Sequence, residues 1–133
     1  MRVLGIDFGK KRIGLAMSDE LKMLATPLEV YERKHYNKDV TFVVGLIKQN
    51  KCETVIIGMP YHMNGQDSQI GELVKEFANS LKIATGCIIE YVDERLTSWQ
   101  GEQIMAETGS KKKNLDSVSA AIILQTYLDS KVK

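Results

Sequence analysis

The sequence has few cysteines and prolines and lacks any long apolar run. It contains two cysteines and two prolines in 133 residues, and no stretch of about 18 apolar residues that could cross a membrane. We expect Cys52 and Cys87 to be reduced, buried thiols of a cytoplasmic protein rather than a disulfide. Asp7 and the cations at positions 10–12 interrupt the N-terminal apolar segment, which argues against a signal peptide.

An excess of charge of one sign is also missing. The formal net charge is +1, so any basic surface must come from local clusters of cations. Apolar residues make up 44% and charged residues 26% of the chain, which is typical of a globular protein. The length and the lack of repeats or linkers predict a single domain over residues 1–133.

Hydrophobic patterning predicts an α/β fold. We expect strands over residues 3–8, 13–17, 24–31, 54–57 and 87–92, and helices over residues 36–49, 69–84, 97–107 and 114–128. Leu73 should lie on the apolar face of the second helix, and Asn114 should cap the last one. A hairpin followed by β-α alternation predicts a mixed five-stranded sheet with helices on both faces.

Acidic residues fall where the predicted strands end. Asp7 closes the first strand, Asp93 and Glu94 follow the last strand, and Asp116 stands in the first turn of the last helix. Each has an ordinary explanation as a turn former, a helix-dipole partner or a solvated charge. Together they map to the ligand-binding edge of the sheet, where carboxylates from separate elements would suit Mg²⁺ or Mn²⁺.

Cations accompany these carboxylates. Lys10, Lys11 and Arg12 follow Asp7, and Arg95 follows the acidic pair. Such residues are either solvated surface charges or contacts to nucleic-acid phosphates. Three lysines at 111–113 precede the last predicted helix and are open to the same two interpretations.

Several segments, in order, resemble the YqgF/RuvX family of Holliday-junction-resolvase-like proteins, which are regarded as nucleases of precursor 16S rRNA. They are residues 7–14 (DFGKKRIG), 55–60, 63–65, 93–97 and 116–124. The resemblance covers nearly the whole chain. It implies a ribonuclease H-like fold and metal-dependent phosphodiester hydrolysis in the 5′ maturation of precursor 16S rRNA, on structured RNA. It also implies that Asp7, the acidic pair and Asp116 occupy active-site positions, and it favours phosphate contact for Lys11 and Arg12. Arg95, beside the acidic pair, would either clamp a phosphate bidentately or pair with Glu94.

One position departs from the related RuvC-type resolvases, which place a carboxylate where this chain has Gly58. The acidic pair lies two strands from Asp7, roughly 9–10 Å away at about 4.8 Å per strand. The longer Glu94 spans that gap more easily, so we predict Asp7, Glu94 and Asp116 as metal ligands, with Asp93 as the alternative to Glu94.

Two other functions remain open on the sequence. One is a resolvase of branched, four-way DNA, which should act as a symmetric homodimer. The other is a non-catalytic nucleic-acid-binding or ribosome-assembly factor. The sequence does not decide between a monomer and a homodimer, and we expect no membrane partner.

Overall fold

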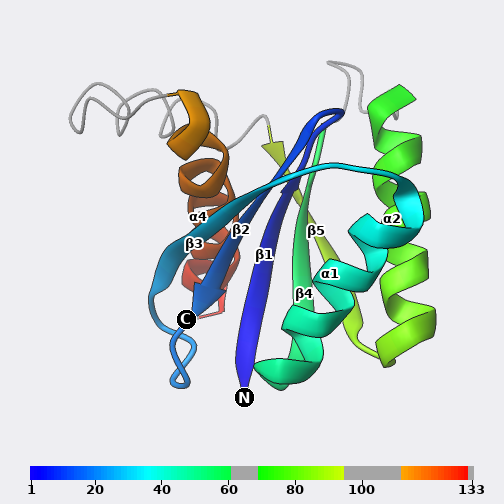
Figure 1. Cartoon of the computed structure of the whole chain (residues 1–133). Coiled ribbons are helices and arrows are strands. Elements are labelled where there is room, and N and C mark those ends of the chain that lie inside the picture. Colours follow the sequence, from blue (N-terminus) through cyan, green and yellow to red (C-terminus); the bar gives the residue numbers. More distant parts are fainter. Residues whose placement is uncertain (61–68, 95–111, 132–133) are drawn as a thin grey trace.

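A computed structural model describes residues 1–60, 69–94 and 112–131 (Figure 1). The elements follow one another as β1 (Arg2–Phe8), β2 (Arg12–Ser18), β3 (Ala25–Glu32), α1 (Tyr36–Gln49), β4 (Cys52–Met59), α2 (Gln69–Thr85), β5 (Ile88–Asp93) and α4 (Lys112–Ser130). The helix predicted over residues 97–107 lies outside the described residues.

The strands form one mixed sheet, as the sequence predicted. Their order is β3-β2-β1-β4-β5, with antiparallel pairs among β1, β2 and β3 and parallel pairs of β4 with β1 and β5. The carboxyl ends of β1, β4 and β5 therefore meet at one edge, at the top of Figure 1. That edge is where Asp7 and the acidic pair were expected to converge.

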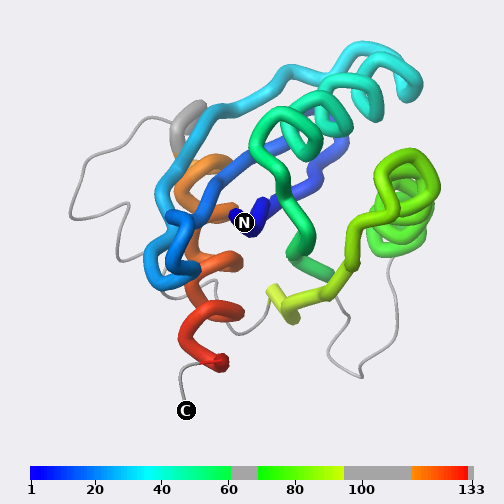
Figure 2. Tube along the Cα trace, turned by 90° about the horizontal axis from the view of Figure 1, so that it is seen from below, coloured from blue at the N-terminus to red at the C-terminus, as the bar shows by residue number. Residues whose placement is uncertain are grey.

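Helices cover both faces of the sheet. Figure 2 shows α4 on one side and α1 and α2 on the other. Alternation along β1 separates the two cores: Leu4, Ile6 and Phe8 pack beneath α1 and α2, whereas Val3 packs against α4. The Phe8 and Phe77 rings, whose centroids are 4.8 Å apart, join β1 to α2. Asp7 consequently points to the α4 face.

The predicted elements differ from the observed ones mainly at their ends. The helix over Tyr36–Gln49 is confirmed, and the second helix begins at Gln69 as expected. Leu73, predicted to face the core, is 41% exposed, because the buried stripe of α2 runs through Val74, Phe77, Ala78 and Leu81.

The last helix begins earlier than predicted. It starts at Lys112, so Asn114 is inside the helix rather than at its cap, and Asp116 lies in the second turn rather than the first. Lysines favour the helix about as well as most residues do, which lets it extend toward the N-terminus. The two cysteines are free and buried, as expected. Among the described helices, none is long and apolar enough to span a membrane.

Candidate active site at the carboxyl edge of the sheet

Asp7 is the residue around which the site is built. It is the last but one residue of β1 and pairs with Gly14 of β2. The parallel register that aligns Ile6 with Ile57 brings Gly58 of β4 beside it on the other side. Asp7 thus stands between two glycines, and the space above them on the α4 face is open to other side chains.

Glu94 fills the space above Gly58. A Cβ at position 58 would lie 2.7 Å from Glu94 Oε1 and 2.9 Å from Glu94 Cγ. The side chain therefore crosses β4 from the end of β5, and its carboxyl group hydrogen-bonds with that of Asp7. Asp93 is the last residue of β5, opposite Met59, and its charge acts on Glu94. The structure brings Asp7 and Glu94 together, the pair that side-chain length had favoured.

The two carboxyl groups strongly perturb each other. Burial raises the pKa of Asp7 well above its ordinary value, and the charge and hydrogen bond of Glu94 and the charge of Asp116 raise it further. Burial also raises the pKa of Glu94, an effect that the hydrogen bond from Asp7 partly offsets. Ionising both carboxyl groups is therefore costly in this setting, and the pair titrates as one coupled unit. A nearby positive charge would reduce that cost.

Asp116 lies close to this pair but is held by a cation. Arg12 Nε donates a 2.7 Å hydrogen bond to Asp116 Oδ2, an ion pair between residues 104 positions apart. The bond to Asp116 and then its charge raise the pKa of Arg12. Within residues 1–60, 69–94 and 112–131, no three acidic, histidine or cysteine side chains are grouped closely enough to hold a metal ion. The charge of Asp116 is close enough to raise the pKa of Asp7, but its carboxylate is bonded to Arg12.

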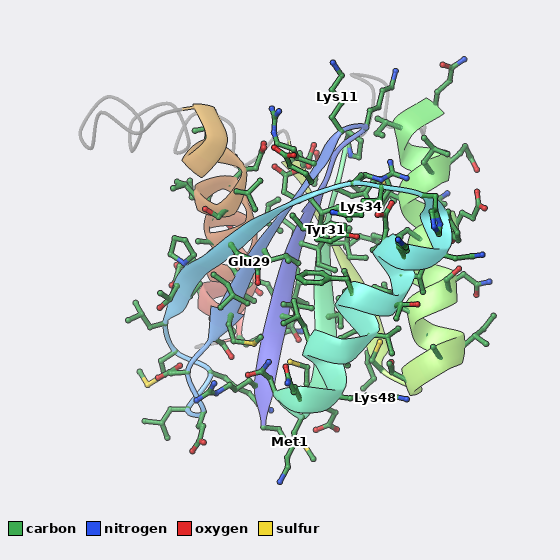
Figure 3. The ribbon with its side chains drawn as sticks, in the orientation of Figure 1. Met1, Lys11, Glu29, Tyr31, Lys34 and Lys48 are labelled. Atoms are coloured by element: carbon green, nitrogen blue, oxygen red, sulfur yellow. The ribbon has the colours of Figure 1, made fainter. Side chains whose placement is uncertain are left out.

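The predicted phosphate contacts are only partly described. Lys10 and Lys11 are exposed at the tip of the β1–β2 hairpin, which the Gly9 N–H closes with a 2.9 Å bond to the Arg12 carbonyl (Figure 3 labels Lys11). Arg95, the loop at 61–68 and Lys111 lie outside the described residues, as do the side chains of residues 112 and 113. The structure therefore places the cations of the hairpin and leaves the other predicted contacts as predictions.

Arg33 is a functional candidate that the sequence analysis missed. Its Nη1 donates to the carbonyls of Gly9 and Lys10 at 3.2 and 3.3 Å, and its backbone N–H donates to the Lys11 carbonyl at 2.9 Å. Its guanidinium lies 4.6 Å from the centre of the Phe8 ring. Arg33 therefore fastens the hairpin tip to the chain that follows β3.

Asp39 anchors Arg33 in turn. It is fully buried in the first turn of α1 and accepts a 3.0 Å bond from Arg33 Nε and a 2.9 Å bond from the Lys34 N–H. Burial pushes the pKa of Asp39 upward, but these bonds and one from Tyr31 outweigh it, so the pKa is lowered. The only signal in the sequence was an aspartate near a helix N-terminus, which is too common to indicate such a partner.

The sheet order, with α4 packed on the face toward which Asp7 points, defines a ribonuclease H-like fold, in agreement with the prediction. A solved structure of T. thermophilus RuvC, in complex with a Holliday junction substrate, matches with a TM-score of 0.63 and 17% sequence identity, over 98% of this chain and 95% of that chain. At this identity the likeness concerns the fold.

Sequence comparison identifies the family. The family model described as "RuvX: Holliday junction resolvase" matches residues 1–130. A protein of Caldanaerobacter subterraneus subsp. tengcongensis is 38% identical over 135 residues, 98% of this chain and 97% of its own length. One of Natranaerobius thermophilus is 40% identical over 136 residues, 99% of this chain and 96% of its own length. Both carry the name "Putative pre-16S rRNA nuclease". The chain belongs to the RuvX family, as its motifs predicted.

Proposed function

We propose that this protein is a divalent-metal-dependent nuclease that hydrolyses phosphodiester bonds of precursor 16S rRNA, in its 5′ maturation. The observation that carries the proposal is the pairing of Asp7 and Glu94, from two different strands, at the carboxyl edge of a nuclease-type sheet. Two relatives named for pre-16S rRNA support the choice of substrate. The free, buried Cys52 and Cys87 agree with work in the reducing cytoplasm.

The carboxylates suit a hard divalent cation, Mg²⁺ or Mn²⁺, in their chemistry, and Asp116 would have to turn from Arg12 to join Asp7 and Glu94 on it. Asp7, Glu94 and Asp116 offer carboxylate oxygens from three separate elements, with Asp93 as the alternative to Glu94. The raised pKa values of Asp7 and Glu94 show that two negative charges are costly there, so added positive charge is favourable. When bound, such a metal activates a water and neutralises charge on the leaving oxygen.

The cations have a complementary task in this proposal. Lys11, Arg12 and Arg95 bind the phosphates that flank the cleaved bond and hold the backbone in register with the carboxylates. Arg12 can do this while it orients Asp116, because only its Nε is engaged in that ion pair and a guanidinium has further N–H groups that can reach a phosphate. Arg33 fixes the hairpin that carries Lys11 and Arg12.

The test is cleavage of a 5′-extended 16S rRNA precursor fragment by the purified protein with Mg²⁺, with Mn²⁺ and with EDTA. We expect cleavage only with metal. Losing a residue that hydrogen-bonds to a metal ligand costs about 10–100-fold, so Asp7→Asn, which changes a proposed ligand itself, should lower cleavage by more than about 100-fold. Asp129→Asn is the matched control, since this exposed residue near the end of α4 loses the same charge. Cleavage that survives in the Asp7→Asn protein would refute the metal-nuclease mechanism.

A four-way DNA junction is the second candidate substrate. The description of the matching family model as a Holliday junction resolvase favours it. The same assay with a four-way junction decides between the two: symmetric cuts in paired strands by a homodimer support a resolvase, and cleavage confined to the RNA supports rRNA maturation.

A further inference from the structure

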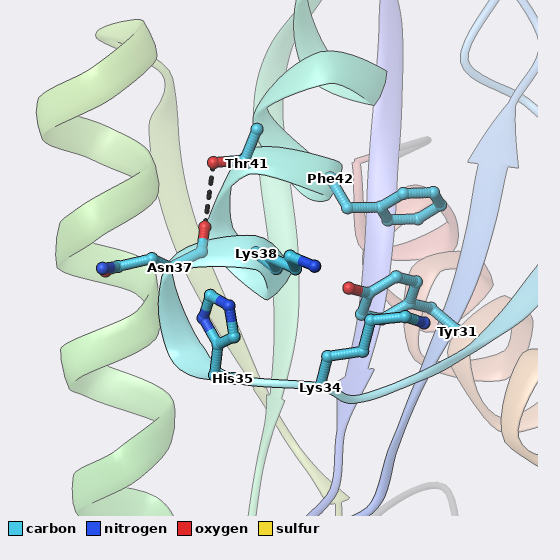
Figure 4. A pocket seen from close by; sticks show the side chains of 7 residues that line it. All are labelled: Tyr31, Lys34, His35, Asn37, Lys38, Thr41 and Phe42. Atoms are coloured by element: carbon cyan, nitrogen blue, oxygen red, sulfur yellow. Dashed lines mark hydrogen bonds between the residues drawn. The ribbon is translucent and has the colours of Figure 1, made fainter.

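A groove lies on the face of the molecule opposite the acidic site, between the end of β3 and the start of α1. Its volume is ≈ 430 Å³, within the range of sites that bind small ligands or single nucleotides. Figure 4 shows Tyr31 and Phe42 on one side of it and Lys34, Lys38 and Thr41 around them. No role in the proposed chemistry accounts for this groove.

The apolar part of the groove is a pair of stacked rings. The centroids of Tyr31 and Phe42 are 4.3 Å apart, and their planes are inclined by 18°. Lys34 Nζ lies 5.2 Å from the centre of the Tyr31 ring. Both rings are only partly buried, so the groove offers aromatic and apolar surface beside an amine.

The charged part of the groove is positive. Lys34 and Lys38 line it and are exposed, and no acidic side chain is among its lining residues in the described part of the chain. The nearest acidic neighbours along the chain are engaged elsewhere. Glu32 acts on Arg12 at the other face of the sheet, and Asp39 is buried against Arg33. A ligand for this groove is therefore anionic and also carries flat or apolar groups.

The groove is fixed to the hairpin tip of the acidic edge. Arg33, next to Lys34 in the chain, binds the carbonyls of Gly9, Lys10 and Lys11 while its charge is paired with Asp39, so the groove is tied to the hairpin tip that carries Lys11. Figure 3 shows Lys11 and Lys34 at the same end of the molecule, with Tyr31 below them. A strand that contacts Lys11 can continue over the tip and onto the rings.

We propose that this groove binds a single-stranded stretch of the nucleic-acid substrate outside the cleaved bond. Phosphates contact Lys34 and Lys38, and a base or sugar lies against the exposed surface of the Tyr31–Phe42 pair. Aromatic and cationic side chains in one groove are the combination that holds single strands without reading their sequence. The inference depends on the proposed function for the kind of ligand, but binding in the groove requires neither a metal nor cleavage.

Binding without cleavage tests this inference. A fluorescent single-stranded RNA of about 12 nucleotides, the span of one such site, and the DNA of the same sequence are titrated in EDTA and followed by anisotropy. The variant is Lys34→Ala with Lys38→Ala. The control is Lys48→Ala with Lys82→Ala, which removes the same charge from the far ends of α1 and α2.

The groove variant should bind both strands about tenfold more weakly at 0.15 M salt, and its log–log salt slope should fall by about 1.4, which corresponds to two lost phosphate contacts on a single strand. Phe42→Leu, which keeps apolar volume and removes the ring, should weaken binding about fivefold or more. A fully paired RNA duplex should compete poorly with the single strand.

Three results would overturn the assignment: equal affinities of the groove variant and the control, unchanged binding by Phe42→Leu, or equal competition by the duplex. Failure of the proposed nuclease function would be seen separately. In that case the Asp7→Asn protein would still cleave the precursor. The EDTA binding assay compares only groove variants and their control, so its outcome would not change.

Discussion

Helix α4 approaches β2 closely at Gly14, and this contact allows a prediction of definite size. A Cβ at this position would overlap the carbonyl group of Asp116 and lie 3.1 Å from the Asp116 Cα. The obstacle is helix backbone, which cannot rotate aside as a side chain can. Gly14→Ala must therefore push α4 away from β2 by about 1 Å, and overpacking of this kind costs about 1–3 kcal/mol. We expect the upper end of that range.

The same displacement should impair the site. Asp116 would move with the helix, and a shift of about 1 Å in a catalytic group can cost about 100-fold in rate. Gly45→Ala is the matched control, because a Cβ there meets nothing within 4 Å and Gly45 lies inside α1. That change should stabilise the protein by about 0.5–1 kcal/mol and leave cleavage unchanged.

Urea unfolding followed by circular dichroism, together with the precursor cleavage assay, measures both effects. Neutral surface changes alter the free energy of unfolding by up to about 0.5 kcal/mol. If Gly14→Ala lowers it by no more than that, then α4 does not rest on β2 as described. If it is destabilised but cleaves normally, the position of Asp116 does not matter to the reaction.

Three further predictions concern the carboxyl groups. Asp39→Asn should lower the free energy of unfolding by about 1.5–3 kcal/mol near neutral pH. Because the fold lowers the pKa of Asp39, this difference should shrink in urea titrations as the pH falls below about 3.9; a constant difference would contradict it. A raised pKa means that the ionised carboxylate of Asp7 opposes folding. In EDTA, Asp7→Asn should therefore unfold at a higher urea midpoint than the wild type at pH 8, but not below about pH 3.9. Equal midpoints of the two proteins at pH 8 would contradict this. Gly58→Ala should lower cleavage about tenfold or more by displacing the Glu94 carboxylate. It should also cost about 1–3 kcal/mol of stability, because its Cβ would lie 2.6 Å from the Cδ1 of the buried Ile123; unaltered cleavage would exclude a role for the Glu94 contact.

Much of the fold could be predicted because it depends on local patterns. The apolar positions of α1 recur at helical spacing, and its limits, Tyr36–Gln49, were predicted to the residue. The strands were found by their short apolar runs, although β1, β2 and β4 are longer than predicted and β3 and β5 are shifted by one residue. The prediction failed where the signal was weak: Leu73 is apolar but lies outside the buried stripe of its helix, and the lysines before Asn114 gave no sign in the sequence that α4 begins at Lys112.

The site was predictable only as far as strand ends determine it. Asp7 and Glu94 are 87 positions apart, but both follow from the rule that parallel strands present their carboxyl ends at one edge. The partners of Arg12 and Arg33 do not follow from such a rule. Each depends on how closely an element packs on the sheet, and packing depth is a tertiary property that periodicity does not report.

Gly58 and Glu94 are best understood as one arrangement. A side chain at position 58 would occupy the space that the Cγ and Oε1 of Glu94 now fill, so the glutamate can cross β4 only above a glycine. A shorter acidic residue at 94 would leave that space empty and its carboxylate farther from Asp7. Gly58 therefore does more than lack a carboxylate, because the space above it lets the Glu94 carboxylate reach the same edge of the sheet. Gly14, on the other side of Asp7, admits α4 in the same way, so two glycines determine how closely Glu94 and Asp116 approach Asp7.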